Sequence, residues 1–292
     1  MGVGPALADA AERVRQLPEL GVGLHLTLVG ERPACRPEEV RSLVGRDGLL
    51  LPGYRAFLLR YLRRGIHPGD VRRELRAQAA AVAALGISLD HLDSHQHLHL
   101  LPGLMARALE VAREYGARWV RAPRPLRAVV GRQSPDAHPA SLGTRPLRGY
   151  PQTPDPSSKS SVDSAASPRS LSERMIFQAA SAWARRRLAR EGLPLAAGSL
   201  GFDCSGHLTS EYLLRHIPAL PPGVTELICH PGEGDPETRE RYRGWGYHWE
   251  QELKALTDPA VREALELCGV RVTTFGRVPG EAGCGKLGAA RR

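Results

Sequence analysis

The feature that most constrains the fold of this chain is a repeated alternation of helix-patterned and strand-patterned segments. Short apolar runs bounded by glycine or proline are typical of buried strands, and longer runs with apolar residues three and four apart are typical of helices. Helix patterns cover residues 5–16, 68–85, 102–115, 170–190, 209–217 and 249–267, and strand patterns cover residues 22–29, 87–95, 118–122, 198–203, 224–230 and 270–275. Six strands separated by helices predict an α/β fold with mostly parallel strands.

The length of 292 residues is enough for one large α/β domain with a full core, and we expect a single domain over residues 1–278. Residues 140–170 are crowded with proline, serine and glycine. Because such a segment cannot bury enough apolar area to offset the entropy of ordering, we expect a mobile, disordered insertion there. The basic, glycine-rich residues 279–292 are expected to form a disordered tail.

Composition excludes several classes of protein. A hydrophobic fraction of 42% with 24% charged residues is typical of a globular protein, and no apolar stretch approaches the roughly 18 residues needed to cross a bilayer. The first twenty residues contain no apolar core of a secretory signal. The five cysteines are scattered, which indicates neither a disulfide framework nor a thiolate zinc site. We therefore expect a soluble, cytoplasmic protein without a membrane span.

The net charge of +9 does not by itself indicate a nucleic-acid partner. The arginines are spread along the chain, and aromatic residues make up only 5% of it. A protein that binds single strands would need a basic stripe interleaved with stacking side chains, and the sequence has none. We expect no nucleic-acid binding, and assembly into a homo-oligomer stays open.

The most informative segment for function is DHLDSHQHLHLLP at residues 90–102. Its alternate positions hold polar side chains, namely His91, Asp93, His95, His97 and His99. This spacing places side chains on one face of a strand. Burial of several imidazoles and a carboxylate without partners is costly, so the ring nitrogens require a metal ion or a hydrogen-bond network. A strand that begins at residue 87 should end near His95, with His97 and His99 in the following loop.

Two other strand patterns carry a histidine. His25 lies in GVGLHLTL on the face opposite the leucines, beside small residues that leave room for it. His230 ends an apolar strand pattern and is followed at once by a Pro-Gly turn. Because the carboxyl ends of parallel strands meet at one rim, we expect His25, His95 and His230 to converge on one pocket. Taken singly, each histidine has the plainer interpretation of a residue at a strand end.

A hydrolytic metal centre built on His25 and His95 needs a further ligand, because two neutral imidazoles alone bind a hard cation weakly. Asp93 is the local candidate for this carboxylate. Its position two residues before His95 equally suits a group that hydrogen-bonds to an imidazole and orients it. Both roles of Asp93 stay open from the sequence.

Three segments carry a family resemblance: GLHLTLVGERP at residues 23–33, HLDSHQHLHLLP at residues 91–102 and ELICHPGEGD at residues 226–235. In this order and at these separations they resemble the YdjC/ChbG family of carbohydrate deacetylases, including its hopanoid-associated branch. The resemblance extends from about residue 5 to residue 275. It implies a TIM-barrel-like (β/α) barrel, a divalent metal ion that is magnesium or, alternatively, zinc, and hydrolysis of an N-acetyl group on an amino sugar.

Carried over residue by residue, the resemblance implies that His25 and His95 are metal ligands. The family takes its third ligand and its catalytic base from paired aspartates in an Asn-Ala-Asp-Asp-Phe-Gly segment, and this sequence has no such segment. The element order indicates the same gap, since a helix at residues 5–16 would normally return from a preceding parallel strand. A helix that merely caps the sheet is the alternative. We expect that the first βα unit is absent, through a misplaced start codon or in a fragment or degenerate relative, and the activity of the chain stays open.

With the full set of groups, the resemblance implies metal-assisted amide hydrolysis of a small N-acetylated sugar substrate. An aspartate would take the proton of the attacking water, and His230 is our candidate for the imidazole that protonates the leaving nitrogen. Asp93 stays a candidate catalytic residue. Arg121, in the strand pattern WVRAP, is a candidate for orienting the base or holding a sugar hydroxyl, with an ordinary surface arginine as the alternative. Four side chains could stack on a sugar ring or pack at the barrel rim: Trp245, Tyr247, His248 and Trp249.

Two functions of other classes also stay open. A catalytically silent sugar-binding or regulatory protein would keep the histidines without the aspartates. A metal-dependent phosphoesterase of another α/β family would also place histidines at strand ends.

Overall fold

The computed structural model describes residues 1–126 and 171–278. These residues divide into two compact units, the first from residues 1–124, 171–196 and 272–278 and the second from residues 125–126 and 197–271. The expectation of a single domain over residues 1–278 stays a prediction. The expected insertion and the expected tail lie outside the described residues. In the part of the chain that is described, none of the helices combines the length and apolar character that a membrane span requires.

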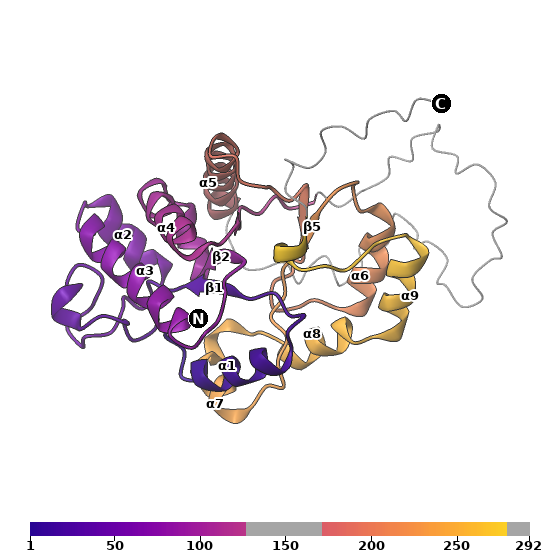
Figure 1. The fold of residues 1–292 in the computed structure, drawn as a ribbon, viewed down its shortest axis with the longest axis horizontal. Helices are drawn as coiled ribbons and strands as arrows, with labels where there is room; N and C mark the ends of the chain where they lie inside the picture. Colours follow the sequence, from indigo (N-terminus) through magenta and orange to yellow (C-terminus); the bar gives the residue numbers. More distant parts are fainter. Residues whose placement is uncertain (127–170, 279–292) are drawn as a thin grey trace. The chain divides into compact units, whose positions relative to one another are not determined.

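The first unit contains a three-stranded parallel sheet, with β1 (Gly23–Leu26), β2 (His91–Ser94) and β3 (Trp119–Val120) in that order. Its helices are α1 (Leu7–Gln16), α2 (Tyr54–Leu62), α3 (Pro68–Ala83), α4 (Pro102–Tyr115) and α5 (Leu171–Arg190). Short 3-10 segments are η1 (Pro37–Glu39), η2 (His95–Leu100) and η5 (Phe275–Arg277). The helices α3 and α4 lie side by side beside the sheet (Figure 1).

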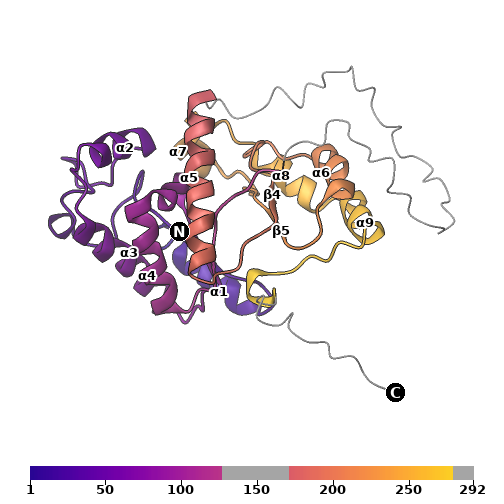
Figure 2. The ribbon, with the colours of Figure 1, turned by 90° about the horizontal axis from the view of Figure 1, so that it is seen from above.

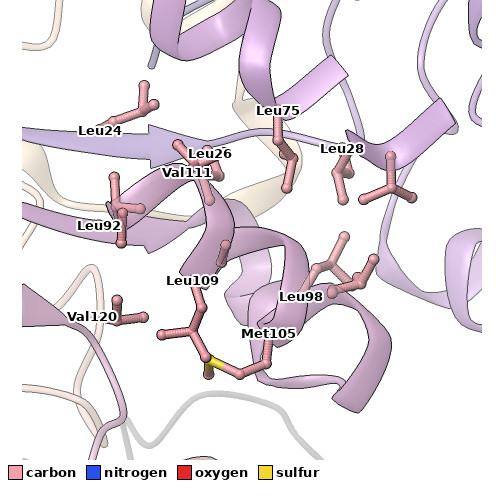
Figure 3. Packing of buried hydrophobic residues seen from close by; sticks show 14 of the residues in the cluster. Leu24, Leu26, Leu28, Leu75, Leu92, Leu98, Met105, Leu109, Val111 and Val120 are labelled. Atoms are coloured by element: carbon pink, nitrogen blue, oxygen red, sulfur yellow. The ribbon is translucent and has the colours of Figure 1, made fainter. Parts of the chain in front are cut away.

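The register of the strands gives this sheet one apolar face and one polar face. Leu24 of β1 pairs with Leu92 of β2, and His25 pairs with Asp93. Since successive side chains of a strand point to opposite faces, the leucines lie together on one face and the His–Asp pair lies on the other. Figure 3 shows the leucines in the core with side chains of α3 and α4, among them Leu75, Met105 and Leu109.

The bounds of α4 follow from residues at its two ends. Pro102 occupies the first turn, where its missing N–H is no loss, and Gly116 follows the last residue with a φ of 75°. Glycine adopts this left-handed conformation without steric cost, so the helix stops there. The predicted helix over residues 102–115 is therefore confirmed.

The second unit contains two parallel strands, β4 (Gly198–Leu200) and β5 (Thr225–Leu227). Its helices are α6 (Ser210–His216), α7 (Pro236–Arg241), α8 (Trp249–Leu256) and α9 (Pro259–Leu267), with 3-10 segments η3 (Ile217–Ala219) and η4 (Arg243–Trp245). Figure 2 shows β4 beside β5 and α6 beside α9. A small core of its own joins these elements, including Leu208, Leu213 and Ala264.

Two sequence predictions for the second half of the chain are wrong. The expected helix over residues 249–267 is split into α8 and α9, because the Asp258 side chain accepts the backbone N–H of Ala260 and Pro259 begins a new helix. The expected strand over residues 270–275 does not form. Phe275 instead begins η5, and the centroid of its ring lies 4.4 Å from the centroid of the His91 ring.

The mixed α/β class with mostly parallel strands is confirmed, since β1, β2 and β3 pair in parallel and so do β4 and β5. Over residues 1–126 and 171–278 there are five strands in two sheets, where the sequence suggests six. These described strands form no closed barrel, so the TIM-barrel-like arrangement is not confirmed.

Candidate functional site

A row of polar side chains crosses the polar face of the three-stranded sheet. His25 on β1 hydrogen-bonds through Nδ1 to Oδ1 of Asp93 on β2, at 2.8 Å. Arg121 directly follows β3 and forms an ion pair with the other oxygen of Asp93. The backbone N–H of Arg121 donates to the carbonyl of Leu92 at 2.8 Å, which extends the ladder between β2 and β3. The parallel register thus brings three of the predicted site residues together.

Asp93 is buried and remains anionic. Burial alone raises the pKa of its carboxyl group, but the charges of His25 and Arg121 and the hydrogen bond with His25 outweigh this effect and hold the pKa well below its usual range. One carboxylate oxygen contacts His25 and the other contacts Arg121. This arrangement favours the second role that the sequence leaves open for Asp93, which is to orient the His25 imidazole.

The rings of His25 and His95 lie next to each other, with centroids 5.6 Å apart and planes at 77°. His95 is buried directly after β2, whereas the His25 side chain is 31% exposed. Because a metal–nitrogen bond is about 2 Å long, two imidazoles on one ion have centroids within about 6.5 Å of each other. The observed separation satisfies this limit. Since Asp93 occupies Nδ1 of His25, Nε2 is the nitrogen with which His25 can bind a cation.

The set of metal-binding side chains is incomplete. Over the described residues, no group of three or more His, Cys, Asp or Glu side chains could hold a metal ion. Magnesium usually keeps several of its water molecules and is held through one or two carboxylates, whereas imidazole nitrogens suit zinc better. His25 and His95 therefore fit as two ligands of an ion, and do not make a complete site.

The turn after β2 has an unusual backbone. Gln96 and His97 have φ angles of 53° and 55°, a left-handed conformation that costs a non-glycine residue roughly 1 kcal/mol or more. The Gln96 side chain accepts the backbone N–H of Tyr54 at the start of α2, at 2.6 Å. The ring centroids of His97 and of Phe177 on α5 are 5.3 Å apart. These contacts with two helices hold the turn, and with it the adjacent His95.

His99 has a structural role. Its Nε2 donates to the carbonyl of Arg121 at 2.6 Å, and its Nδ1 lies 2.6 Å from the Ser94 hydroxyl, which must then be the donor. Burial lowers the pKa of His99 to about 4, so the ring is neutral at pH 7. The His99 ring thus links Ser94, at the end of β2, to Arg121, which pairs with Asp93.

His91 lies on the same face of β2 as Asp93, but near the start of the strand. Its Nδ1 hydrogen-bonds to the carboxylate of Asp90, and the ring contacts Phe275. Its ring also covers Gly23, where a Cβ atom would lie 2.2 Å from His91 Nε2. His91 therefore packs as a structural residue. Of the alternating polar residues in this segment, Asp93 and His95 are the ones beside His25.

His230 lies in the second unit, three residues after β5. Its backbone N–H donates to the carboxylate of Glu252, a buried residue of α8 that also accepts the backbone N–H of Leu208 at 3.2 Å. The Ser205 hydroxyl lies 3.4 Å from Nδ1 of His230 and 3.3 Å from the Tyr247 hydroxyl. These contacts fix the His230 ring within its own unit.

The first unit thus brings together His25, Asp93, His95 and Arg121. His230 belongs to the other unit, and each unit is described by itself. The convergence of His230 with the other two histidines stays a prediction.

Two buried polar residues that hold the loops around these sites were not predicted from the sequence. On α3, Glu74 accepts the backbone N–H groups of Ala34 and Cys35, at 2.8 and 3.0 Å. Gln78 donates to the carbonyl of Thr27 and accepts its N–H, which fixes the chain directly after β1. The signal was present in the sequence, because Glu74 and Gln78 fall on the same helical stripe as the apolar residues Val71, Leu75 and Val82. A polar residue on such a stripe indicates a buried hydrogen-bond partner.

The chain is similar to a known protein family, to individual named proteins and to a solved structure. A family model described as YdjC-like protein matches residues 1–267. A carbohydrate deacetylase of Vibrio vulnificus (strain CMCP6) is 41% identical over 111 residues, which is 38% of this chain and 41% of that protein. A carbohydrate deacetylase of Geobacillus stearothermophilus is 35% identical over 125 residues, covering 42% and 47% of the two chains. The matches therefore span less than half of these bacterial relatives.

A human protein, also named carbohydrate deacetylase, is 29% identical over 285 residues, covering 92% of this chain and 78% of the relative. Among solved structures, a protein of Enterococcus faecalis V583 described provisionally as a cellobiose-phosphate cleavage protein has a TM-score of 0.61 and 21% identity. That likeness covers 94% of this chain and 84% of the other, and it concerns the fold alone. Because the family model extends over most of the sequence, this chain belongs to the YdjC-like protein family.

Proposed function

We propose that this protein is a hydrolase that removes the acetyl group from the nitrogen of an amino sugar. The observation that carries the proposal is the pair of imidazoles of His25 and His95, backed by the buried Asp93 carboxylate at the ends of neighbouring parallel strands. Relatives of this chain bear the name carbohydrate deacetylase, which supports the same class of substrate.

We further propose that His25 and His95 hold a divalent metal ion, magnesium or zinc. When bound, such an ion lowers the pKa of a coordinated water molecule and polarises the carbonyl group of the substrate. Asp93 accepts the Nδ1–H of His25, which fixes the direction of the ring and leaves Nε2 as the nitrogen that can bind the ion. Arg121 neutralises Asp93 and holds its second oxygen. In this proposal Asp93 and Arg121 act through His25 and do not touch the substrate.

For the leaving nitrogen, we propose His230 as the proton donor. Glu252 fixes its backbone and the Ser205 hydroxyl lies close to its Nδ1, which leaves Nε2 as the nitrogen that can exchange a proton with a substrate. The contacts described above assign no residue as the base that takes the proton of the attacking water. This gap, together with the incomplete set of metal ligands, favours one second candidate function, a sugar-binding protein without catalysis.

The test of the proposed function is release of acetate from N-acetylglucosamine oligomers by the full chain with added magnesium or zinc. A phosphate monoester serves as the comparison substrate. We expect the parent chain to release acetate and the His95→Ala chain not to release it, because His95 would hold the ion. Phosphate release instead of acetate would assign a phosphoesterase, and sugar binding without either product would assign the non-catalytic function.

A second variant separates the roles of the histidines. His230→Ala should lower turnover and leave the affinity for the metal ion unchanged, because His230 is proposed to act on the leaving group. Loss of metal affinity in that variant would contradict its role as proton donor.

A further inference from the structure

A cavity of about 780 Å³ lies within the first unit, where the loop of residues 38–46, the end of α2 and the start of α3 meet. This volume is typical of a site for a small molecule. Its lining consists mainly of charged and polar side chains, among them four arginines. Among the described residues that form this lining, none is His25, Asp93, His95 or Arg121, so the cavity is not the site on the sheet.

Two of the three carboxylates in the lining already have a cationic partner. Asp70 forms an ion pair with Arg73, and Glu39 forms an ion pair with Arg36 at 3.0 Å. Asp70 also accepts the backbone N–H of Ser42 at 3.0 Å. These two negative charges are therefore used within the wall of the cavity and its immediate surroundings.

Three arginines of the lining have no such partner. Over residues 1–126 and 171–278, Arg41, Arg46 and Arg60 form no ion pair with a carboxylate. In the same part of the chain, Glu38 is the carboxylate of the lining that forms no ion pair. The cavity therefore has an excess of unpaired positive charge, which attracts an anion.

Arg60 is held in place without a neutralising carboxylate. Its Nη1 donates to the backbone carbonyls of Ser42 and Val44, at 3.1 and 2.9 Å. Gly65 packs on its stem, since a Cβ atom at that position would lie 3.0 Å from Cγ of Arg60. The side chain is partly buried, and a cation taken partly out of water without a counter-ion has a cost in free energy. A bound anion would offset part of this cost.

The loop that carries Arg41 and Arg46 is also fixed. Between them, the Ser42 hydroxyl oxygen accepts the backbone N–H of His67 at 3.0 Å, and the Ser42 N–H is held by Asp70. Both arginine side chains are exposed. Because the backbone beneath them is already ordered, only their own rotamer freedom is lost when they bind a ligand.

The remaining lining narrows the class of ligand. Among the described residues that line the cavity there is no Phe, Tyr or Trp, and Val44 is the aliphatic side chain. Charge and hydrogen bonds would therefore hold the ligand, and the cavity offers no stacking surface for a nucleoside base or a sugar ring. A phosphate group carries about two negative charges and three strong acceptor oxygens, so it can accept from several guanidinium groups at once.

We propose that this cavity binds a compact phosphate compound without a ring, such as pyrophosphate, through Arg41, Arg46 and Arg60. The unpaired carboxylate of Glu38 opposes the anion and limits its affinity. This inference does not depend on the proposed function, because the cavity and the site on the sheet have no lining residue in common.

The test is calorimetry of the full chain with pyrophosphate, in a buffer that contains EDTA so that no metal ion holds the ligand elsewhere. Arg46→Gln should weaken binding about tenfold, because one charge-assisted hydrogen-bonded pair is lost. Glu38→Gln should strengthen binding about two- to fivefold, because an opposing exposed charge is removed. Thermal unfolding of both variants should match that of the parent, since neither side chain has a partner in the described part of the chain.

The matched control is Arg186→Gln. Arg186 on α5 is exposed like Arg46 and lies outside the cavity, so this variant should bind pyrophosphate as the parent chain does. His25→Ala should also bind it unchanged. The proposal is overturned if the parent chain does not bind pyrophosphate, if Arg46→Gln binds it as the parent does, or if Arg186→Gln shows an equal loss. Tighter binding of citrate than of pyrophosphate at the same ionic strength would overturn the choice of phosphate.

Discussion

At the scale of single residues, the site in the first unit depends on how each polar group is satisfied. His99 donates to the Arg121 carbonyl and Arg121 pairs with Asp93, which in turn hydrogen-bonds to His25. In this row of contacts, each residue binds a donor or acceptor group of the next residue. A change at the buried end, at His99, should therefore affect both stability and the geometry at His25.

The low pKa of His99 makes stability depend on pH. In the unfolded chain this imidazole titrates near 6.5, and in the folded chain near 4. Above pH 6.5 both states are neutral and the contribution of His99 is complete; as the pH falls from 6.5 toward 4, the unfolded state binds the proton and stability is lost. We expect a decrease in the free energy of unfolding of roughly 2 kcal/mol from this group between pH 7 and pH 5.

Urea unfolding at the two pH values checks this expectation. His99→Gln should be less stable than the parent at pH 7, because buried hydrogen bonds are changed. Between pH 7 and pH 5, however, its free energy of unfolding should fall by roughly 2 kcal/mol less than that of the parent. His67 is exposed, so His67→Gln serves as the matched control and should keep the decrease of the parent. Equal decreases in the parent and in His99→Gln would contradict the assignment of a buried neutral imidazole.

The sequence predicted which of these polar side chains lie close together better than it predicted their partners. Alternation of polar groups pointed to Asp93 and His95, and the face opposite the leucines pointed to His25. That Asp93 lies beside His25 depends on the register of β1 against β2, which no local pattern contains. The structural roles of His91 and His99 follow from partners distant in sequence, Phe275 and Arg121, for the same reason.

At the scale of secondary-structure elements, ends marked by proline and glycine were predictable, and α4 has the bounds that the sequence suggests. The error in the helix over residues 249–267 had a local signal. Asp258 followed by Pro259 is typical of a helix start, and it splits the segment into α8 and α9. Strand β2 begins at His91 and not at residue 87, and the residue before it, Asp90, accepts the backbone N–H of Gly276 through its side chain.

The end of α4 allows a direct test of the glycine argument. Gly116 has a φ of 75°, and a Cβ atom there would meet nothing within 4 Å, so any cost of Gly116→Ala is conformational. We expect the free energy of unfolding to fall by about 1 kcal/mol. Gly103→Ala in the first turn of the same helix is the control and should stabilise the protein by roughly 0.5–1 kcal/mol. Thermal or urea unfolding that shows no loss at position 116 would contradict this account of how the helix ends.

At the scale of the whole molecule, element order predicted the α/β class but not which strands pair. Helix and strand patterns are local, whereas the pairing of β1 with β2 and β3, and of β4 with β5, joins residues far apart in the chain. Residues 270–275 have the apolar pattern of a strand but do not form one. The residues that follow contact distant parts of the chain, Gly276 with Asp90 and Arg277 with Glu19. Such contacts cannot be read from periodicity.

Binding of one divalent cation by His25 and His95 can be measured by equilibrium dialysis of the full chain against zinc or magnesium. We expect one ion bound per chain, an affinity at least about tenfold weaker in both His25→Ala and His95→Ala, and an unchanged affinity in His230→Ala. Metal affinities of His25→Ala and His95→Ala that equal that of the parent chain would contradict this expectation.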